Sequence, residues 1–446
     1  MKIKSIKGSV VAPMGFSAEG VFCNIKRIGT GKGSSKGPKP DLALIVSDRP
    51  ASIAGMFTTN QVCAAPVKVC LSRVARGTAR AVVVNSGNAN ACTGRQGLLD
   101  AREMTRLAGA RLKIPSGQIL VASTGRIGVP LPMAQVQAGI QSAAAGLGAT
   151  PDHAGRAAHA IMTSDTRRKE VALECVLGRH RIRIGGICKG AGMIHPGMSP
   201  SGRRPVSLPR ELHATMLGFL TTDAAVEPDA LQWVLTEAVA TSFNRITVDG
   251  DMSTNDTVLL LANGAAGNTA LRLGRGGRPS RELLQFQEAV QQACALLARW
   301  MVEDGEGVHR VVTVRVEGAR NTAEADAAAR AVSNSALVKT SWHGGDPNWG
   351  RIIDALGYSS ARVVERKVDI GYSARDGRKI LWSLKGGQPT RVSFAALCRA
   401  VARPTFDLHI RLNLGRGRAA LQAADLTEAY VDFNKGDISD PASMGG

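Results

Sequence analysis

Short apolar runs separated by glycine-containing breaks recur along the whole chain. Runs of this length, bounded by turn residues, predict β-strands. The clearest are "DLALIVSD" (41–48), "ARAVVVNSGN" (79–88), "QILVASTG" (118–125), "ITVDGDMSTNDTVLLLANG" (246–264), "VVTVRVEG" (311–318) and "DLHIRLNLG" (407–415). Because these runs are spread over the whole sequence, we expect β-sheet throughout the fold.

A second pattern, with apolar positions three or four residues apart, predicts helices between the strands. Downstream of Ser280, which is placed to cap a helix, one face carries Leu283, Phe286, Val290, Cys294, Leu297 and Met301. The alanine-rich stretch 133–148 predicts another helix. Asp425 followed by Glu428 resembles a capping box that opens a short helix through Tyr430. Mixed strands and helices predict an α/β fold.

The composition fits a large folded protein without a membrane segment. The chain has 446 residues, 44% of them hydrophobic, which suits two or three domains or one large layered unit. No apolar run reaches the roughly 18 residues that a membrane helix needs. The basic start has neither the apolar segment of a signal peptide nor the pattern of a transit peptide, so we expect a cytoplasmic protein.

The formal net charge of +20 suits nucleic acids, acidic small molecules or simply a basic surface. Aromatic residues make up only 4% of the chain, too few for a base-stacking surface, and the arginines are scattered. We therefore expect neither a nucleic-acid partner nor a membrane partner.

No cysteine or histidine spacing is typical of a metal site. None of the eight cysteines forms a Cys-x-x-Cys pair, so we expect reduced core thiols. The segment "DGDMSTND" (249–256) lacks the glycine and glutamate of a calcium loop, and we interpret it as a loop whose side chains bond to backbone. His195, His213 and His343 show no ligand spacing, so the sequence predicts no metal.

The stretch "HATMLGFLTTDAAV" (213–226) places a threonine between a small residue and an apolar run. A threonine that begins a chain can act as a nucleophile, because its own α-amine serves as the base. Cleavage of the Ala214–Thr215 bond would create such a residue, and the apolar run would bury the new terminus. By itself, the stretch is better explained as the start of a core strand or helix.

Two glycine-containing segments could surround such a nucleophile. In "GGICKGAGMIHPGM" (185–198), glycines beside Lys189 let backbone approach a ligand next to a positive charge. In "VASTGRIG" (121–128), a strand ends at Thr124 and Gly125, whose hydroxyl and amide could face a developing oxyanion. Each segment alone is also typical of an ordinary glycine turn or strand end.

Together these segments resemble the glutamate N-acetyltransferase family of arginine biosynthesis, also called ornithine acetyltransferase, whose members are self-cleaving threonine enzymes. The resemblance covers nearly the whole chain in long, ordered blocks. They are "VVAPMGFSAEGV", "DLALIVSD", "VVVNSGNANACTG", "VASTGRIG", "AIMTSDT", "GGICKGAGMIHP", "ATMLGFLTTDAAV", "SFNRITVDGDMSTNDT", "EDGEGV", "SALVKTSWHGGDPNWGRIIDALGYS" and "YVDFN". The implied fold is that family's α/β arrangement of layered mixed sheets and helices.

The resemblance also implies roles for residues. Cleavage at Ala214–Thr215 would give an α chain (1–214) and a β chain (215–446) whose first residue is the nucleophile. Thr215 would take acetyl from N2-acetyl-L-ornithine, release L-ornithine and pass the acetyl group to L-glutamate, with Thr124 and Gly125 as the oxyanion hole. The implied substrate contacts are Thr166, Lys189, Thr215, Glu306, Asn434 and Ser439, the last in place of a threonine.

These roles suit amino-acid substrates. Lys189 can pair with a carboxylate and Glu306 with an ammonium group. One nucleophile used twice lets donor and acceptor share a pocket. The resemblance further implies an α2β2 heterotetramer that needs no cofactor or metal. Members of the family differ in whether acetyl-CoA also serves as a co-substrate.

The chain departs from the family pattern mainly upstream of Thr215. Gly197 stands where the family has asparagine, and the insert "SPSGRRPVSLPRELH" (199–213) precedes Ala214. Self-cleavage depends on backbone strain, and we expect it to be retained, with the insert bulging outward. Smaller departures are Val308, His309 and Arg310 in "DGEGVHR" and the tail beyond Ser439.

Two alternatives stay open from the sequence. An aminopeptidase or amidase with the same self-cleaving nucleophile would hydrolyse the acyl ester and release free acetate. An uncleaved, inactive relative would act as a basic binding protein and would run as one full-length band on a denaturing gel.

Overall fold

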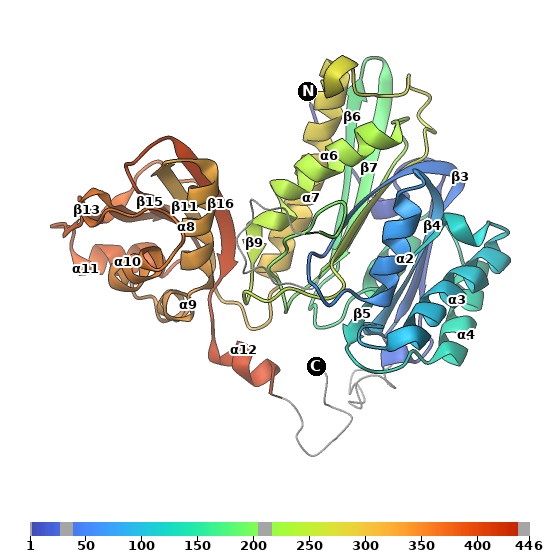
Figure 1. Ribbon diagram of the computed structural model, residues 1–446, viewed down its shortest axis with the longest axis horizontal. Coiled ribbons are helices and arrows are strands. Elements are labelled where there is room, and N and C mark those ends of the chain that lie inside the picture. Colours follow the sequence, from blue (N-terminus) through green and yellow to red (C-terminus); the bar gives the residue numbers. More distant parts are fainter. Residues whose placement is uncertain (1, 27–38, 204–215, 436–446) are drawn as a thin grey trace.

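Two β-sheets organise the chain into two lobes that lie side by side (Figure 1). The structure, a computed structural model, describes residues 2–26, 39–203 and 216–435. Helices pack against both sheets, so the expected α/β arrangement of layered mixed sheets and helices is confirmed.

The larger sheet has nine strands. In spatial order they are β1 (Lys4–Ser5), β6 (Lys169–Leu177), β7 (His180–Lys189), β8 (Leu217–Thr222), β10 (Thr257–Ala262), β3 (Leu42–Phe57), β4 (Thr78–Asn88) and β5 (Ile119–Arg126), with β2 (Phe16–Val21) paired to β3. β8 lies between β7 and β10, so segments from both sides of the expected cleavage point share one sheet. Ala214 and Thr215 themselves lie outside the described residues.

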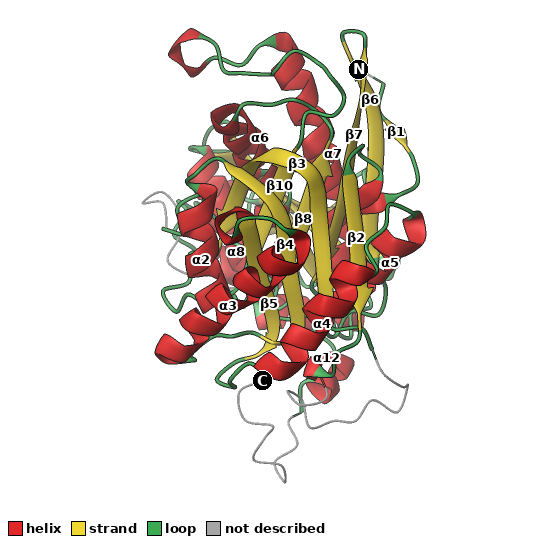
Figure 2. Ribbon diagram, turned by 90° about the vertical axis from the view of Figure 1, so that its right-hand side faces the viewer, coloured by secondary structure: helices red, strands yellow, loops and turns green. Residues whose placement is uncertain are grey.

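Both faces of this sheet are buried, which explains why its central strands are apolar at successive positions. In β10, Leu259 and Leu261 pack into one core, whereas Val258 and Leu260 pack into the other, because successive side chains of a strand point to opposite faces. The helices of the first core are α2 (Ala65–Val74), α3 (Gly94–Leu112), α4 (Met133–Ala145) and α5 (Pro151–Ala160), and those of the second are α6 (Pro228–Ala240) and α7 (Arg281–Glu303) (Figure 2).

The smaller sheet has seven strands and builds the second lobe around a third core. Its spatial order is β14 (Gln388–Pro389), β13 (Leu381–Lys385), β12 (Asp369–Ala374), β15 (Thr405–Arg411), β11 (Val311–Ala319), β16 (Gly417–Ala424) and β9 (Ile246–Thr247). Its helices are α8 (Thr322–Asn334), α9 (Ala336–Gly344), α10 (Trp349–Gly357) and α11 (Phe394–Val401). After β16, the chain leaves this lobe and forms α12 (Glu428–Phe433) (Figure 1).

Short 3-10 turns complete the described elements: η1 (Ser9–Val11), η2 (Ser116–Gln118), η3 (Phe243–Arg245), η4 (Arg275–Gly277) and η5 (Glu365–Lys367). Most predicted strands are present, although the stretch 246–264 forms two strands, β9 and β10, because a polar loop separates them. Ser280 caps α7 as predicted, accepting a hydrogen bond from Leu283 N at 3.1 Å. The predicted cap of α12 is wrong: Thr427, not Asp425, accepts from Tyr430 N, at 3.0 Å.

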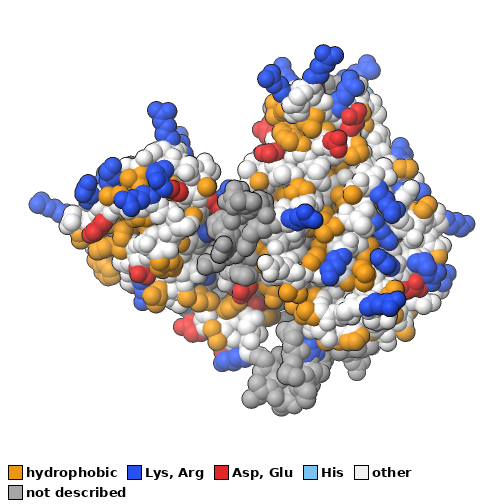
Figure 3. Space-filling view, viewed as in Figure 1, with side chains coloured by type: hydrophobic (Ala, Val, Ile, Leu, Met, Phe, Trp, Pro, Cys, Tyr) orange, Lys and Arg blue, Asp and Glu red, His pale blue; other side chains and the backbone are white. Residues whose placement is uncertain are grey.

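The surface and the thiols agree in part with the sequence analysis. Lysine and arginine side chains are dispersed over the face seen in Figure 3. All eight cysteines are free thiols, but only Cys70, Cys175, Cys188 and Cys294 are buried, and Cys92 is exposed. No helix among the described residues is both long and apolar enough to cross a bilayer.

Candidate active site

The turn at the end of β5 carries Thr124 and Gly125, the two residues predicted to form an oxyanion hole. β4 and β5 are parallel, and Gly87 lies opposite Gly125. Gly125 has a φ of +128°, and a Cβ there would lie 2.4 Å from the carbonyl carbon of Gly87. Only glycine fits such a conformation and such a close approach. The Thr124 side chain is buried while Gly125 is exposed, so the turn opens to solvent at one residue.

A buried hydrogen-bond network fixes this turn. Asn255 Nδ2 donates to the carbonyls of Ser123, at 2.8 Å, and Ala89, at 2.7 Å. Ser123 Oγ donates to Asn85 Oδ1 at 2.6 Å. The "VVVNSGNANACTG" segment therefore lies beside the site, and its asparagine side chains hold backbone in place.

Lys189 ends β7 and faces this turn. Its Nζ donates to Thr124 Oγ1 at 3.3 Å, and the side chain is 2% exposed. Burial lowers the pKa of Lys189, and the Asp165 carboxylate partly opposes that shift. In the antiparallel β7–β8 pair, Lys189 lies opposite Leu217, two positions after Thr215 in the sequence. The lysine thus stands next to the strand that follows the predicted nucleophile.

Sequence reasoning missed the charged cluster behind Lys189. Lys169 Nζ forms ion pairs with Asp165, at 2.6 Å, and with Asp304, and the three side chains are 3% exposed or less. Asp165 also accepts from Gly190 N at 2.7 Å. Burial alone would raise the pKa of Asp165, but Lys169 and Lys189 outweigh it and lower that pKa to about 2. The cluster therefore holds the Lys189–Gly190 backbone with a fixed negative charge.

Thr166 is tied to the same cluster. Its backbone N donates to Asp304 Oδ2 at 3.2 Å, and its hydroxyl donates to Asp304 Oδ1. The hydroxyl oxygen keeps acceptor capacity, and the residue is exposed. Asp165 and Asp304 lie within the blocks "AIMTSDT" and "EDGEGV". Their position in blocks that carry the family resemblance was the sequence signal that could have identified them.

The first described residue of the β8 segment is held by another missed carboxylate. Met216 N donates to Asp256 Oδ1 at 2.5 Å, and Met216 is fully buried. Burial raises the pKa of Asp256 well above its ordinary value. Its Oδ2 is buried and has no hydrogen-bond partner among the described residues. A carboxyl group in this state is available to hold or receive a proton beside the segment that Thr215 precedes.

Glu306 and Asn434 form a separate, more open corner. Asn434 Nδ2 donates to Glu306 Oε2 at 3.0 Å, and Glu306 N donates to the carbonyl of Ala191 at 3.0 Å. Gly192 lies against this carboxylate, because a Cβ there would be 2.4 Å from it. The structure thus brings Glu306, Asn434 and the glycine loop after Lys189 together. Ser439 lies outside the described residues.

The "DGDMSTND" segment supports that glycine loop. Asp249 accepts from Met193 N at 2.5 Å, Ile194 N at 2.8 Å and Asp251 N at 3.2 Å. The prediction of a backbone-bonding polar loop is confirmed, and the loop also bonds to a neighbouring segment. A cavity of about 410 Å³ lined by Arg245, Arg315, Arg375 and Arg418 contains none of the predicted site residues.

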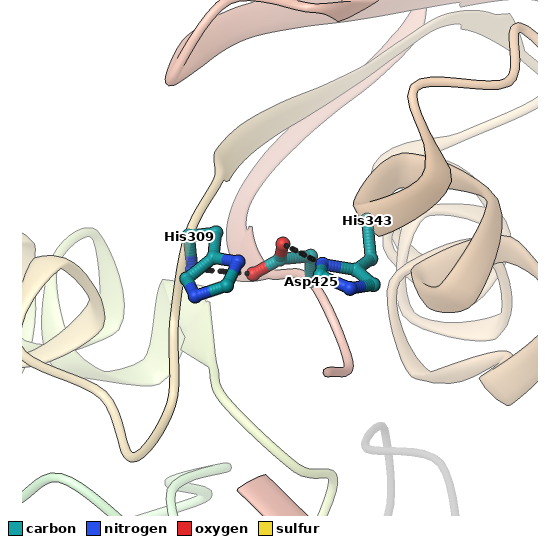
Figure 4. A group of neighbouring side chains, drawn as sticks. All are labelled: His309, His343 and Asp425. Carbon is teal, nitrogen blue, oxygen red and sulfur yellow. Dashed lines mark hydrogen bonds and ion pairs between the residues drawn. The ribbon is translucent and has the colours of Figure 1, made fainter. Parts of the chain in front are cut away.

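The histidines lie in different surroundings. His195 is buried, with Arg330 Nη1 2.7 Å from its Nε2, and His213 lies outside the described residues. His309, to which no metal role was given, lies near His343 and Asp425, with one possible ligand atom from each within 4.8 Å of the others (Figure 4). Sequence spacing could not reveal this group, because its members are far apart in the chain.

Comparisons with known proteins identify the family of the chain. The sequence pattern of the ArgJ family matches residues 20–436. The "Arginine biosynthesis bifunctional protein ArgJ" of Symbiobacterium thermophilum is 44% identical, covering 96% of this chain and 98% of its own. The protein of the same name from Geobacter sulfurreducens is 46% identical, covering 88% of this chain and 93% of its own.

Among solved structures, the ArgJ protein of Bacillus halodurans is 38% identical and aligns with a TM-score of 0.41, covering 45% of this chain and 100% of its own. Ornithine acetyltransferase of Mycobacterium tuberculosis, complexed with ornithine, is 36% identical with a TM-score of 0.40, covering 44% of this chain and 100% of its own. The full-length identities and the family pattern lead to one conclusion: the chain belongs to the ArgJ family.

Proposed function

We propose that the chain carries acetyl from N2-acetyl-L-ornithine to L-glutamate through an ester on Thr215, which self-cleavage at Ala214–Thr215 makes the first residue of a β chain. Membership of the ArgJ family makes the chain a bifunctional acetyltransferase of arginine biosynthesis. The observation that carries the residue assignment is the contact of Lys189 with Thr124, beside the strand that Thr215 precedes.

The first half of the reaction forms the acetyl ester. The α-amine of Thr215 takes the hydroxyl proton as Oγ1 attacks the acetyl carbonyl of N-acetylornithine. Oxyanion charge is stabilised by the Gly125 N–H and the Thr124 hydroxyl. Because Thr124 Oγ1 accepts its hydrogen bond from Lys189, its own proton stays available to donate. The tetrahedral intermediate then breaks the amide bond, and the Thr215 ammonium returns the proton to the departing ornithine amine.

The second half reverses these steps with glutamate. Its amine attacks the ester carbonyl, the same donors hold the oxyanion, and Thr215 Oγ1 leaves with the proton. The products are N-acetylglutamate and a free Thr215. Ornithine and glutamate share the α-amino and α-carboxylate groups and differ only in their side chains. One site can therefore serve both.

Recognition of the two amino acids falls to the open corner and the loop before it. The Asn434 amide occupies one oxygen of Glu306, which leaves the other oxygen for a substrate ammonium group. Lys189 supplies positive charge towards a carboxylate, and Thr166 supplies a hydroxyl oxygen. We assign recognition of the substrate carboxylate end to Asn434 and Ser439, as the family resemblance implies.

Assembly and location belong to the same proposal. We expect an α2β2 heterotetramer in the cytoplasm, with no cofactor or metal needed for acetyl transfer. Use of acetyl-CoA as an additional donor to glutamate is tested by supplying it in place of N-acetylornithine.

One assay tests the proposal against both alternatives. The purified chain is incubated with N-acetylornithine and isotopically labelled glutamate, and N-acetylglutamate and free acetate are both measured. We expect label in N-acetylglutamate, two fragments on a denaturing gel, and loss of both in Thr215→Ala but not Thr215→Ser. Acetate without N-acetylglutamate would identify an amidase, and one full-length band without activity would identify a binding protein.

A further inference from the structure

His309, His343 and Asp425 converge where the second lobe meets α12 (Figure 4). His309 precedes β11, His343 lies in the last turn of α9, and Asp425 directly follows β16. Asp425 Oδ1 accepts from the backbone N of His309 at 3.0 Å, so the two segments are already joined. From this arrangement we propose that the three side chains bind a divalent transition-metal ion of the zinc type.

The hydrogen bonding of His343 leaves its Nδ1 available as a metal ligand. Its Nε2 lies 2.8 Å from Glu428 Oε2, and a carboxylate at that nitrogen holds the ring proton there. The lone pair of Nδ1 then points towards Asp425 Oδ2, 3.5 Å away. A carboxylate that orients a histidine in this way is the usual outer partner of a metal-binding imidazole.

When His343 is neutral, two buried acceptors face each other; when it is protonated, the same two atoms form an ion pair. His343 Nδ1 and Asp425 Oδ2 are both buried and have no hydrogen-bond partner among the described residues. Buried polar atoms are nearly always paired. A cation between these two atoms would satisfy both at once.

The geometry suits zinc. With bonds of about 2.0–2.2 Å, the ligand atoms of a tetrahedral zinc site lie about 3.3–3.6 Å apart, and the Nδ1–Oδ2 separation is 3.5 Å. The His309 ring centroid is 5.2 Å from that of His343, and its side chain is exposed, so it can turn inward to complete the set. Two imidazoles and one carboxylate leave a fourth position for water, a donor set that zinc accepts well.

Two positively charged side chains lie beside this site. Arg310 Nη1 donates to the carbonyl of Trp342 at 2.9 Å and to that of His343, so its charge is directed at the end of α9. The Lys339 ammonium donates to the carbonyl of Ala424, next to Asp425. Burial lowers the pKa of Lys339 to about 8, and the Asp249 and Asp425 carboxylates oppose that shift.

A bound ion would link the open corner, formed by Glu306 and Asn434, to the second lobe. Glu306 lies just before His309, and Thr427 Oγ1 donates to the Gly307 carbonyl at 2.7 Å. The ion would take no part in acetyl transfer, so its binding is measured independently of activity.

The test uses the full purified chain, stripped of metal with a chelator and titrated with Zn²⁺ and with Co²⁺. We expect one equivalent of Zn²⁺, a rise in Tm, and visible Co²⁺ bands without a thiolate charge-transfer band. His309→Ala, at an exposed position, should weaken Zn²⁺ binding by more than the roughly 10–100-fold that losing an outer partner causes. His180→Ala, outside the cluster, should bind like the unaltered chain.

Three results would overturn the proposal: equal Zn²⁺ affinity in His309→Ala and the unaltered chain, no binding at all, or a thiolate band that assigns the metal to cysteine. His343→Ala provides a second ligand variant. Circular dichroism of both variants before metal addition verifies that each is folded.

Discussion

The two halves of the candidate active site hold their charges in opposite ways. Behind Lys189, the side chains of Asp165, Lys169 and Asp304 are 3% exposed or less and ion-paired. At the open corner, Glu306 is partly exposed, and Asn434 is exposed at the end of α12, a helix with no buried residue. The buried charges behind Lys189 are therefore fixed before substrate arrives, whereas Asn434 at the open corner ends a loosely packed helix.

This difference has an energetic reason. A preorganised charge near a reacting carbonyl is effective because it does not rearrange during the reaction. Recognition of two different amino acids instead tolerates adjustment, since each contact contributes only modestly. Substitutions in the buried half should therefore affect folding and chemistry, and substitutions in the corner should affect binding.

The largest effect is expected from Lys169→Ala. It removes the ammonium group that pairs with two buried carboxylates, so the unfolding free energy should fall by about 3–5 kcal/mol. Denaturant unfolding measures this. Lys435→Ala removes the exposed Lys435–Asp432 pair and should change stability by less than about 1 kcal/mol. Equal losses of unfolding free energy in the two variants would contradict the proposed difference between the buried half and the open corner.

Gly125→Ala should come next. The added Cβ meets the Gly87 backbone at 2.4 Å and would displace the turn, so kcat should fall by about 100-fold or more, as when an oxyanion donor is lost. Gly128→Ala is a matched control: its φ is also positive, at +81°, but a Cβ there meets nothing within 4 Å. Similar kcat values for the two variants would argue against an oxyanion role for the β5 turn.

Lowering the pH should remove the stability that the charged Asp165 carboxylate provides. Its pKa is about 2 in the folded chain, against an ordinary value of 3.8, so the stability it provides is present above pH 3.8 and is lost as pH falls towards 2. Between pH 5 and pH 3 this loss should be about 1 kcal/mol. Unfolding free energies at the two pH values should differ less in Asp165→Asn than in the unaltered chain or in the exposed control Asp432→Asn. An unchanged pH dependence in Asp165→Asn would contradict the assignment.

The smallest effect is expected from Asn434→Ala. Loss of one exposed hydrogen bond to Glu306 should raise the KM for N-acetylornithine roughly 5-fold, about 1 kcal/mol, with kcat nearly unchanged. Steady-state kinetics separates the two constants, and Asp432→Ala on the same helix is the control. A fall in kcat with unchanged KM would move Asn434 out of a binding role.

The sequence predicted the elements, and the resemblance the two residues of the central contact, more readily than the residues that support them. Strand patterns located β3, β4, β5 and β11, because apolar runs between turns reflect local geometry. The resemblance named Thr124 and Lys189, which the structure brings into contact.

The supporting residues depend on contacts between distant segments. Asp304 meets Lys169 only through the fold, and nothing in the spacing of either residue reveals that ion pair. Asp256 was interpreted as part of a self-bonding loop, yet its carboxylate holds Met216. The grouping of His309, His343 and Asp425 was missed for the same reason, because ligand spacing in sequence detects only sites built on one local motif.

The central claim is that acetyl passes through the hydroxyl of a newly made N-terminal threonine. The most direct measurement is to mix the chain with N-acetylornithine alone, quench in acid, digest, and locate the added acetyl group by mass spectrometry. The account predicts an acetyl ester on a peptide that begins at Thr215, which disappears when glutamate is added before the quench. An uncleaved Ala214–Thr215 peptide, or acetyl found on another residue, would contradict it.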